Sequence, residues 1–103
     1  MDLNIVRKLI ENRKIRWSVH AAARMQERRI RRSDVLNCLE HGKVIEDYPD
    51  DYPTPSCLVF GYTLSREVIH VVVGCDQEMV YIITVYRPDR ENFEADLRTR
   101  KEH

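Results

Sequence analysis

The spacing of apolar residues in this chain changes once, at Gly42, and that change limits which folds are open to it. Before Gly42 apolar side chains recur every three or four positions, as they do along one face of a helix. After Gly42 they come in short alternating or continuous runs, as they do in strands. The sequence therefore predicts an α+β domain in which the helices come first and a sheet follows.

The helical part divides into three segments. Ser18 is a suitable N-cap, because its hydroxyl can accept an orphan amide proton, and Ser33 is a second candidate. Asp34 then lies in a first turn, where the helix dipole favours a carboxylate. Gly42 is expected to end the third helix in the left-handed conformation. The predicted helices cover residues 2–12, 19–29 and about 33–41.

The second part of the chain predicts about four strands and one more helix. Short polar intervals separate the last three strands, so an antiparallel meander is the simplest topology. Asp89 can cap a C-terminal helix that extends to about residue 98, with Phe93 and Leu97 facing the sheet. The predicted strands cover residues 43–48, 57–63, 68–75 and 79–87.

Length and composition predict one cytoplasmic domain, 1–103. No apolar run approaches the roughly 20 residues of a membrane span, and the N-terminus lacks the apolar core of a signal peptide. The three cysteines are widely spaced in apolar surroundings, which is typical of buried thiols. Cys38 and His41 have a metal-ligand spacing, but no second close pair accompanies them, so we expect no metal site and no cofactor.

A net charge of zero conceals a separation of charge along the chain. Residues 1–32 carry 10 basic and 3 acidic side chains, whereas residues 33–56 carry 6 acidic side chains and one lysine. A basic face is then available to a polyanion such as RNA. Alternatively, the acidic segment folds over the basic one and neutralises it. Four roles are open to its aspartates 47, 50 and 51: to form a solvated loop, to close a pocket, to hold an arginine or to face a partner.

The stretch SVHAAARMQERRIRR, residues 18–32, carries the candidate site. On a helix it forms one polar stripe, because residues three and four apart share a face. A titratable imidazole beside fixed cations suits a phosphate ligand, and it also suits an ordinary solvated helix face. The stripe consists of His20, Arg24, Glu27, Arg28 and Arg31.

The last predicted strand, ITVYRPD, supplies a second group. Alternation places Thr84 and Tyr86 on one face and Arg87 on the other, with His70 on the preceding strand. If Tyr86 faces the polar stripe, we expect one pocket that also contains His20, Arg24, Arg28 and Thr84. Alternatively, Arg87 supplies the cation while Tyr86 packs, and His70 is a core histidine bonded to a carbonyl.

Several blocks of the sequence resemble a bacterial domain family of unknown function over roughly residues 15–95. They are S-x-H-A-x-x-R-M-x-x-R-x-I from Ser18 to Ile30, then EDYPDDYPTPSCLVFG, HVVVG and TVYRPD. That family is similar in layout to the RelE-like, BrnT-like and MqsR-like ribonuclease toxins of toxin–antitoxin modules, within the barnase-like nuclease group.

The resemblance implies RNA cleavage without a metal, in which a 2′-hydroxyl attacks the neighbouring phosphate, and it implies an antitoxin protein as partner. On this hypothesis His20 is the general acid or base, because its ordinary pKa lies near 6.5. Arg24 and Arg28 stabilise the phosphate with their planar guanidinium groups, and Tyr86 completes the catalytic set. The remaining substrate-binding candidates are Thr84, Arg87, Arg31 and His70. The alternative is a module that binds nucleic acid or protein through the same basic face without chemistry.

Overall fold

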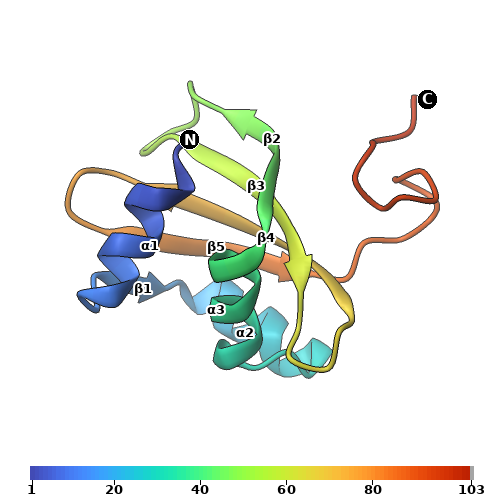
Figure 1. Cartoon of the computed structure of the whole chain (residues 1–103), viewed down its shortest axis with the longest axis horizontal. Helices are drawn as coiled ribbons and strands as arrows, with labels where there is room; N and C mark the ends of the chain where they lie inside the picture. Colours follow the sequence, from blue (N-terminus) through green and yellow to red (C-terminus); the bar gives the residue numbers. More distant parts are fainter. Residues whose placement is uncertain (103) are drawn as a thin grey trace.

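A computed structural model of the chain describes residues 1–102. Residues 1–102 form three helices and five strands in the order shown in Figure 1, which confirms the α+β class. The predicted order, with all helices before the sheet, is wrong, because one short strand lies between the first and second helices. The elements are α1 (Leu3–Glu11), β1 (Ile15–Trp17), α2 (Val19–Arg28), α3 (Arg32–His41), β2 (Lys43–Tyr48), β3 (Ser56–Tyr62), β4 (Val68–Cys75) and β5 (Val80–Tyr86).

The strands form one mixed sheet in the order β1-β5-β4-β3-β2. Strands β2 to β5 make the predicted antiparallel meander. The fifth strand, β1, was not predicted: it lies parallel to β5 and pairs only with residues 80–82. The sheet is therefore mixed rather than purely antiparallel, and the second half of β5 is free of a strand partner on that side.

All three helices pack on one face of the sheet, which holds the main core. Ala21 and Met25 from α2, together with Val35 and Leu39 from α3, contact the inward valines and isoleucines of β3, β4 and β5. The central strand β4 is buried on both faces at Ile69, His70 and Val71, which are fully buried. Since the helices occupy one face, polar groups on β5 must lie on the other.

The opposite face of the sheet is partly covered by the C-terminal segment, residues 87–102, which runs along it without forming a helix (Figure 1). The predicted helix over 89–98 is wrong for a local reason. The carboxylates of Asp89 and Asp96 each accept backbone N–H groups two and three residues ahead, which closes turns instead of helical bonds. Leu97 is left-handed, with φ 58°. Phe93 nevertheless packs on the sheet, as expected, and is 2% exposed.

One predicted helix end is confirmed, and two need correction. Ser18 does cap α2, since its Oγ accepts the N–H of Ala21 at 2.9 Å. The third helix begins at Arg32 rather than after Ser33, and Asp34 caps it by accepting the N–H of Arg31 at 3.0 Å. Gly42 ends that helix, but with φ −83° and not in the left-handed conformation. A Cβ there would overlap the carbonyl oxygens of Cys38 and Phe60, so close approach of backbones explains this glycine.

Two further expectations concern the cysteines and the lengths of the helices. Cys38 and Cys57 are buried and Cys75 is half-buried, as their apolar surroundings predict. Burial raises the pKa of the Cys38 thiol to about 12. None of the helices in residues 1–102 has the length and apolar composition required to cross a lipid bilayer.

Candidate functional site

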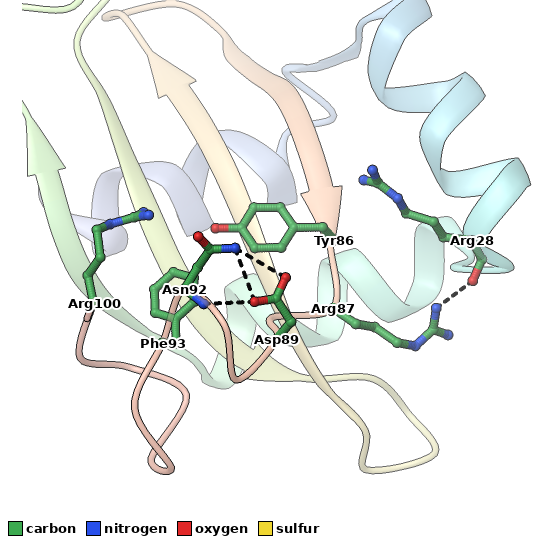
Figure 2. A pocket seen from close by; sticks show the side chains of 7 residues that line it. All are labelled: Arg28, Tyr86, Arg87, Asp89, Asn92, Phe93 and Arg100. Carbon is green, nitrogen blue, oxygen red and sulfur yellow. Dashed lines mark hydrogen bonds between the residues drawn. The ribbon is translucent and has the colours of Figure 1, made fainter. Parts of the chain in front are cut away.

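A cavity of about 590 Å³ lies on the face of the sheet opposite the helices, at the end of β5. The strand end and the C-terminal segment form it together, and the last residue of α2 reaches it from the side (Figure 2). We call it the Tyr86 pocket. It is lined by Arg28, Tyr86, Arg87, Asp89, Asn92, Phe93 and Arg100.

Arg28 reaches the pocket because β1 is short. Helix α2 follows the half of β5 that β1 leaves unpaired, and Ser18 begins it there by donating its N–H to the Ile82 carbonyl at 3.3 Å. One helix length further on, Nη1 of Arg28 donates to the Val85 carbonyl at 2.6 Å. This bond anchors the guanidinium at the sheet edge, and no carboxylate of residues 1–102 forms a salt bridge with it.

The other two arginines of the pocket are paired. Arg100 donates Nε and Nη2 to the two carboxylate oxygens of Glu46 at 3.0 and 3.1 Å, a bidentate pair. This pair lowers the pKa of Glu46. The Arg87 backbone and stem line the cavity, but its guanidinium points away and donates Nη1 to the carbonyl of Arg28 at 2.6 Å and Nε to Glu67 at 3.2 Å. In Figure 2, Arg28 and Arg100 flank the ring of Tyr86 from opposite sides.

A buried imidazole lies directly behind Tyr86. His70 on β4 is fully buried, and its Nε2 lies 2.7 Å from the Leu97 carbonyl. Because a carbonyl only accepts, Nε2 carries the proton, and Nδ1 of the neutral ring is an acceptor. The Tyr86 hydroxyl, 3.2 Å from Nδ1, therefore donates to it. Burial lowers the pKa of His70 and raises the pKa of Tyr86, so both groups are neutral near pH 7.

The floor of the pocket is a turn between Asp89 and Phe93. Asp89 accepts the backbone N–H of Asn92 at 2.9 Å and its side-chain amide at 3.1 Å. Phe93 packs edge-to-face on His70, with ring centroids 4.7 Å apart. The Arg100 guanidinium lies over the Phe93 ring, 4.7 Å from its centroid. The turn thus fixes the wall that carries Arg100.

Three predicted site residues come together here and two lie close behind. Arg28, Tyr86 and Arg87 line the same cavity. His70 faces Tyr86 across the ladder, and Thr84 faces Val72 on the same side of the sheet. His70 is bonded to a carbonyl, as the core-histidine alternative expected.

The other three predicted residues lie elsewhere. His20 lines a separate hollow at the start of α2, and Arg24 forms a salt bridge with Glu27 at 2.8 Å on the exposed face of the helix. Arg31 precedes α3 at an exposed position. The structure does not bring His20 and Arg24 to Tyr86, because α2 lies on the helical face of the sheet while Tyr86 points to the opposite face. Only the end of α2 reaches the site.

Four lining residues were missed from the sequence: Asp89, Asn92, Phe93 and Arg100. Asp89, Asn92 and Phe93 belong to the segment that was predicted as a helix, and Arg100 follows it. The usable signal was the D-R-E-N stretch after Pro88, since Asp and Asn so close together favour turns.

The acidic segment does not cover the polar stripe of α2. Glu46 pairs with Arg100, Asp47 with the N-terminal ammonium of Met1 at 2.7 Å, and Asp51 accepts from Ser56 at 2.6 Å. Within residues 1–102, no group of three His, Cys, Asp or Glu side chains is arranged to hold a metal ion.

The fold and the site together define a small α+β domain whose sheet carries a tyrosine between two arginines at one strand end. Residues 17–87, more than half of the chain, match the family described as "Domain of unknown function (DUF4258)". The chain belongs to this family. No curated protein and no solved structure matches the chain.

Proposed function

We propose that the protein is a toxin-type endoribonuclease that cleaves RNA without a metal ion, and that the scissile phosphate binds in the Tyr86 pocket. The observation that carries this proposal is the place of the Tyr86 hydroxyl, between the buried imidazole of His70 and a cavity flanked by Arg28 and Arg100. The similarity in layout between this family and the RelE-like and BrnT-like ribonuclease toxins suggested the same chemistry.

The proposed reaction begins with attack of a ribose 2′-hydroxyl on the adjacent phosphorus. Its proton passes to the Tyr86 oxygen while Tyr86 releases its own proton to Nδ1 of His70. The bond from phosphorus to the 5′-oxygen breaks, and that oxygen takes a proton from water in the open cavity. The products are a 2′,3′-cyclic phosphate and a 5′-hydroxyl, and His70 returns its proton through Tyr86 to solvent.

The cations supply the second requirement of this reaction. The phosphorane carries two negative charges, and preformed donors directed at it lower the barrier. Arg28 is held by a carbonyl, so its remaining N–H groups and its charge are available to the phosphate. Arg100 keeps its place through Glu46. In this proposal Tyr86 and His70 take the proton-transfer role that the sequence assigned to His20.

Cleavage of RNA in EDTA tests the proposal. Purified protein is incubated with single-stranded RNA, and the product ends are identified by mass spectrometry. We expect 2′,3′-cyclic phosphate ends without added metal. Intact RNA at stoichiometric protein, or cleavage that appears only with a divalent cation, would overturn the proposal.

A second candidate is a module that binds RNA or protein without chemistry. It is favoured by one observation: burial raises the pKa of Tyr86 and lowers that of His70, and both shifts oppose transfer of a proton from one to the other. Tight, salt-sensitive RNA binding with no product would establish this candidate.

The toxin assignment has its own test in cells. Expression of the protein should arrest growth, and Tyr86→Phe should relieve the arrest at equal protein levels. The proposed partner is an antitoxin protein that silences the activity, and co-expression of the neighbouring gene should also restore growth. Unimpaired growth at high expression of the folded protein contradicts the toxin assignment.

A further inference from the structure

A second hollow, separate from the Tyr86 pocket, lies where β1 ends and α2 begins. Its volume is about 760 Å³, and its surface combines an apolar floor with a basic rim. No acidic side chain lines it, in contrast to the Tyr86 pocket. The lining consists of Arg16, Trp17, Ser18, Val19, His20, Arg32, Tyr81, Ile82 and Ile83.

The chemistry of this hollow is that of an aromatic platform beside free cations. The Arg32 guanidinium lies 5.1 Å from the centroid of the Trp17 ring, a cation–π contact. Among the salt bridges of residues 1–102, Arg24, Arg87 and Arg100 each have a carboxylate, but Arg16 and Arg32 have none. The positive charge at the hollow is therefore not neutralised within the described chain.

We infer that the hollow over Trp17 binds one nucleotide of the RNA that occupies the Tyr86 pocket, with the base against Trp17 and Arg32 and the phosphate at Arg16. Bases stack on aromatic rings and on guanidinium planes, and a free arginine complements the phosphate. This inference rests on the proposed function, which it extends from one phosphate to a longer substrate.

Strand β5 connects the two sites. Ile83 lines the hollow and Tyr86 lines the Tyr86 pocket. The two residues are three positions apart on an extended strand, about 10 Å at 3.3 Å per residue. Helix α2 lies along the edge of β5 between them, so a short single strand that binds both sites passes around the outside of this helix.

Trp17 is the one tryptophan of the chain, so its fluorescence reports on this hollow directly. The probe is a 2′-O-methyl RNA oligonucleotide, which binds but lacks the attacking hydroxyl. We expect it to quench Trp17 emission and to lose its effect as salt is raised. Tyr86→Phe should keep the quenching, because the hollow does not depend on the reacting group.

Variants separate the base contact from general charge. Arg32→Gln and Trp17→Leu should each weaken binding of a labelled oligonucleotide by roughly 10-fold to 100-fold, the range seen when a base-stacking side chain is removed. Trp17→Phe keeps an aromatic ring, so it should retain most of the affinity that Trp17→Leu loses. Lys8→Ala, which removes a cation from an exposed position on α1, is the control and should change affinity far less.

The outcomes distinguish this inference from the proposed function. RNA that is cleaved in EDTA while Trp17 emission stays unchanged would overturn the nucleotide site and leave the cleavage proposal standing. Quenching that needs Arg32, together with intact RNA, would retain the nucleotide site and overturn cleavage. An emission change that follows protein concentration alone, with a dimer in sedimentation, would assign the hollow to a second copy of the chain and overturn the inference.

Discussion

The hydroxyl of Tyr86 lies 3.2 Å from Nδ1 of His70, its partner across the ladder between β4 and β5. The two residues are sixteen positions apart in sequence, and antiparallel pairing brings them together. Tyr86 faces the cavity and His70 is closed off beneath Phe93, so the hydroxyl is the contact between a buried imidazole and the surface. This relationship leads to predictions on stability as well as activity.

The burial of His70 predicts that acid weakens the fold. Above its ordinary pKa the imidazole is uncharged in both the folded and the unfolded chain, so burying it carries no electrostatic penalty there. Because burial holds the folded pKa below its ordinary value of 6.5, the unfolded chain binds a proton first as the pH falls. The free energy of unfolding should decrease below about pH 6.5, by at most about 1.4 kcal/mol per pH unit.

Urea denaturation at pH 7.5, 6.5 and 5.5 measures this dependence. His70→Gln carries no titratable group and should lose the decline in this range, whatever its stability at pH 7.5. His20→Gln, at an exposed position on α2, is the matched histidine control and should keep the decline. An equal slope in wild type and His70→Gln contradicts the assignment of the effect to His70.

The two arginines of α2 should differ sharply. Arg28→Ala leaves the Val85 carbonyl without its side-chain donor and removes a pocket cation, so we expect a stability loss of about 1–3 kcal/mol and strongly reduced RNA cleavage. Arg24→Ala removes only an exposed pair with Glu27 and should cost about 0–1 kcal/mol. Parallel denaturation and cleavage assays on both variants test this. Equal losses of activity would argue against the Tyr86 pocket as the site.

Phe93 should hold the C-terminal segment on the sheet. Truncation of such a buried aromatic costs about 3–5 kcal/mol, and most of that cost should appear as release of the segment, because Phe93 is the one buried side chain within residues 87–102. Trypsin should then cut Phe93→Ala faster at Arg98 and Arg100 than it cuts wild type. Leu64→Ala, at a position that is 63% exposed, is the control. Unchanged cleavage of the segment in Phe93→Ala would contradict this role.

Substitutions of Gly42 test why a glycine is needed at the end of α3. A left-handed helix end would accept asparagine at little cost. Close approach to the carbonyls of Cys38 and Phe60 excludes any side chain, so Gly42→Ala and Gly42→Asn should both destabilise, by about 1–3 kcal/mol. Urea denaturation decides between them, and a wild-type midpoint for Gly42→Asn would favour the left-handed explanation.

Local patterns predicted most of the architecture. The meander follows from alternation and short intervals between strands, and α2 from Ser18 and its apolar spacing. Strand β1 could not be predicted in the same way, because three residues carry little periodicity and their partner, β5, lies more than sixty residues away. The prediction of a C-terminal helix is wrong because the turns closed by Asp89 and Asp96 outweigh the helical spacing of Phe93 and Leu97.

The candidate site was predicted in part. Alternation correctly placed Thr84 and Tyr86 on one face of β5, where they pair with Val72 and His70. It could not reveal the irregularity before them: Val72 pairs with Thr84 and Val73 with Ile82, which leaves Ile83 as an extra residue. Nor could the helical stripe show that α2 lies on the opposite side of the sheet from Tyr86. Which imidazole lies at the pocket depends on that tertiary arrangement.

Single-turnover cleavage of RNA in EDTA by wild type, Tyr86→Phe and Tyr52→Phe is the most direct test of the account. Tyr52 is 91% exposed, so its variant controls for the loss of a hydroxyl. We predict that Tyr86→Phe binds RNA like wild type but cleaves it about 10²-fold to 10⁴-fold more slowly, while Tyr52→Phe is unchanged. Equal cleavage rates for wild type and a folded Tyr86→Phe would contradict the central claim.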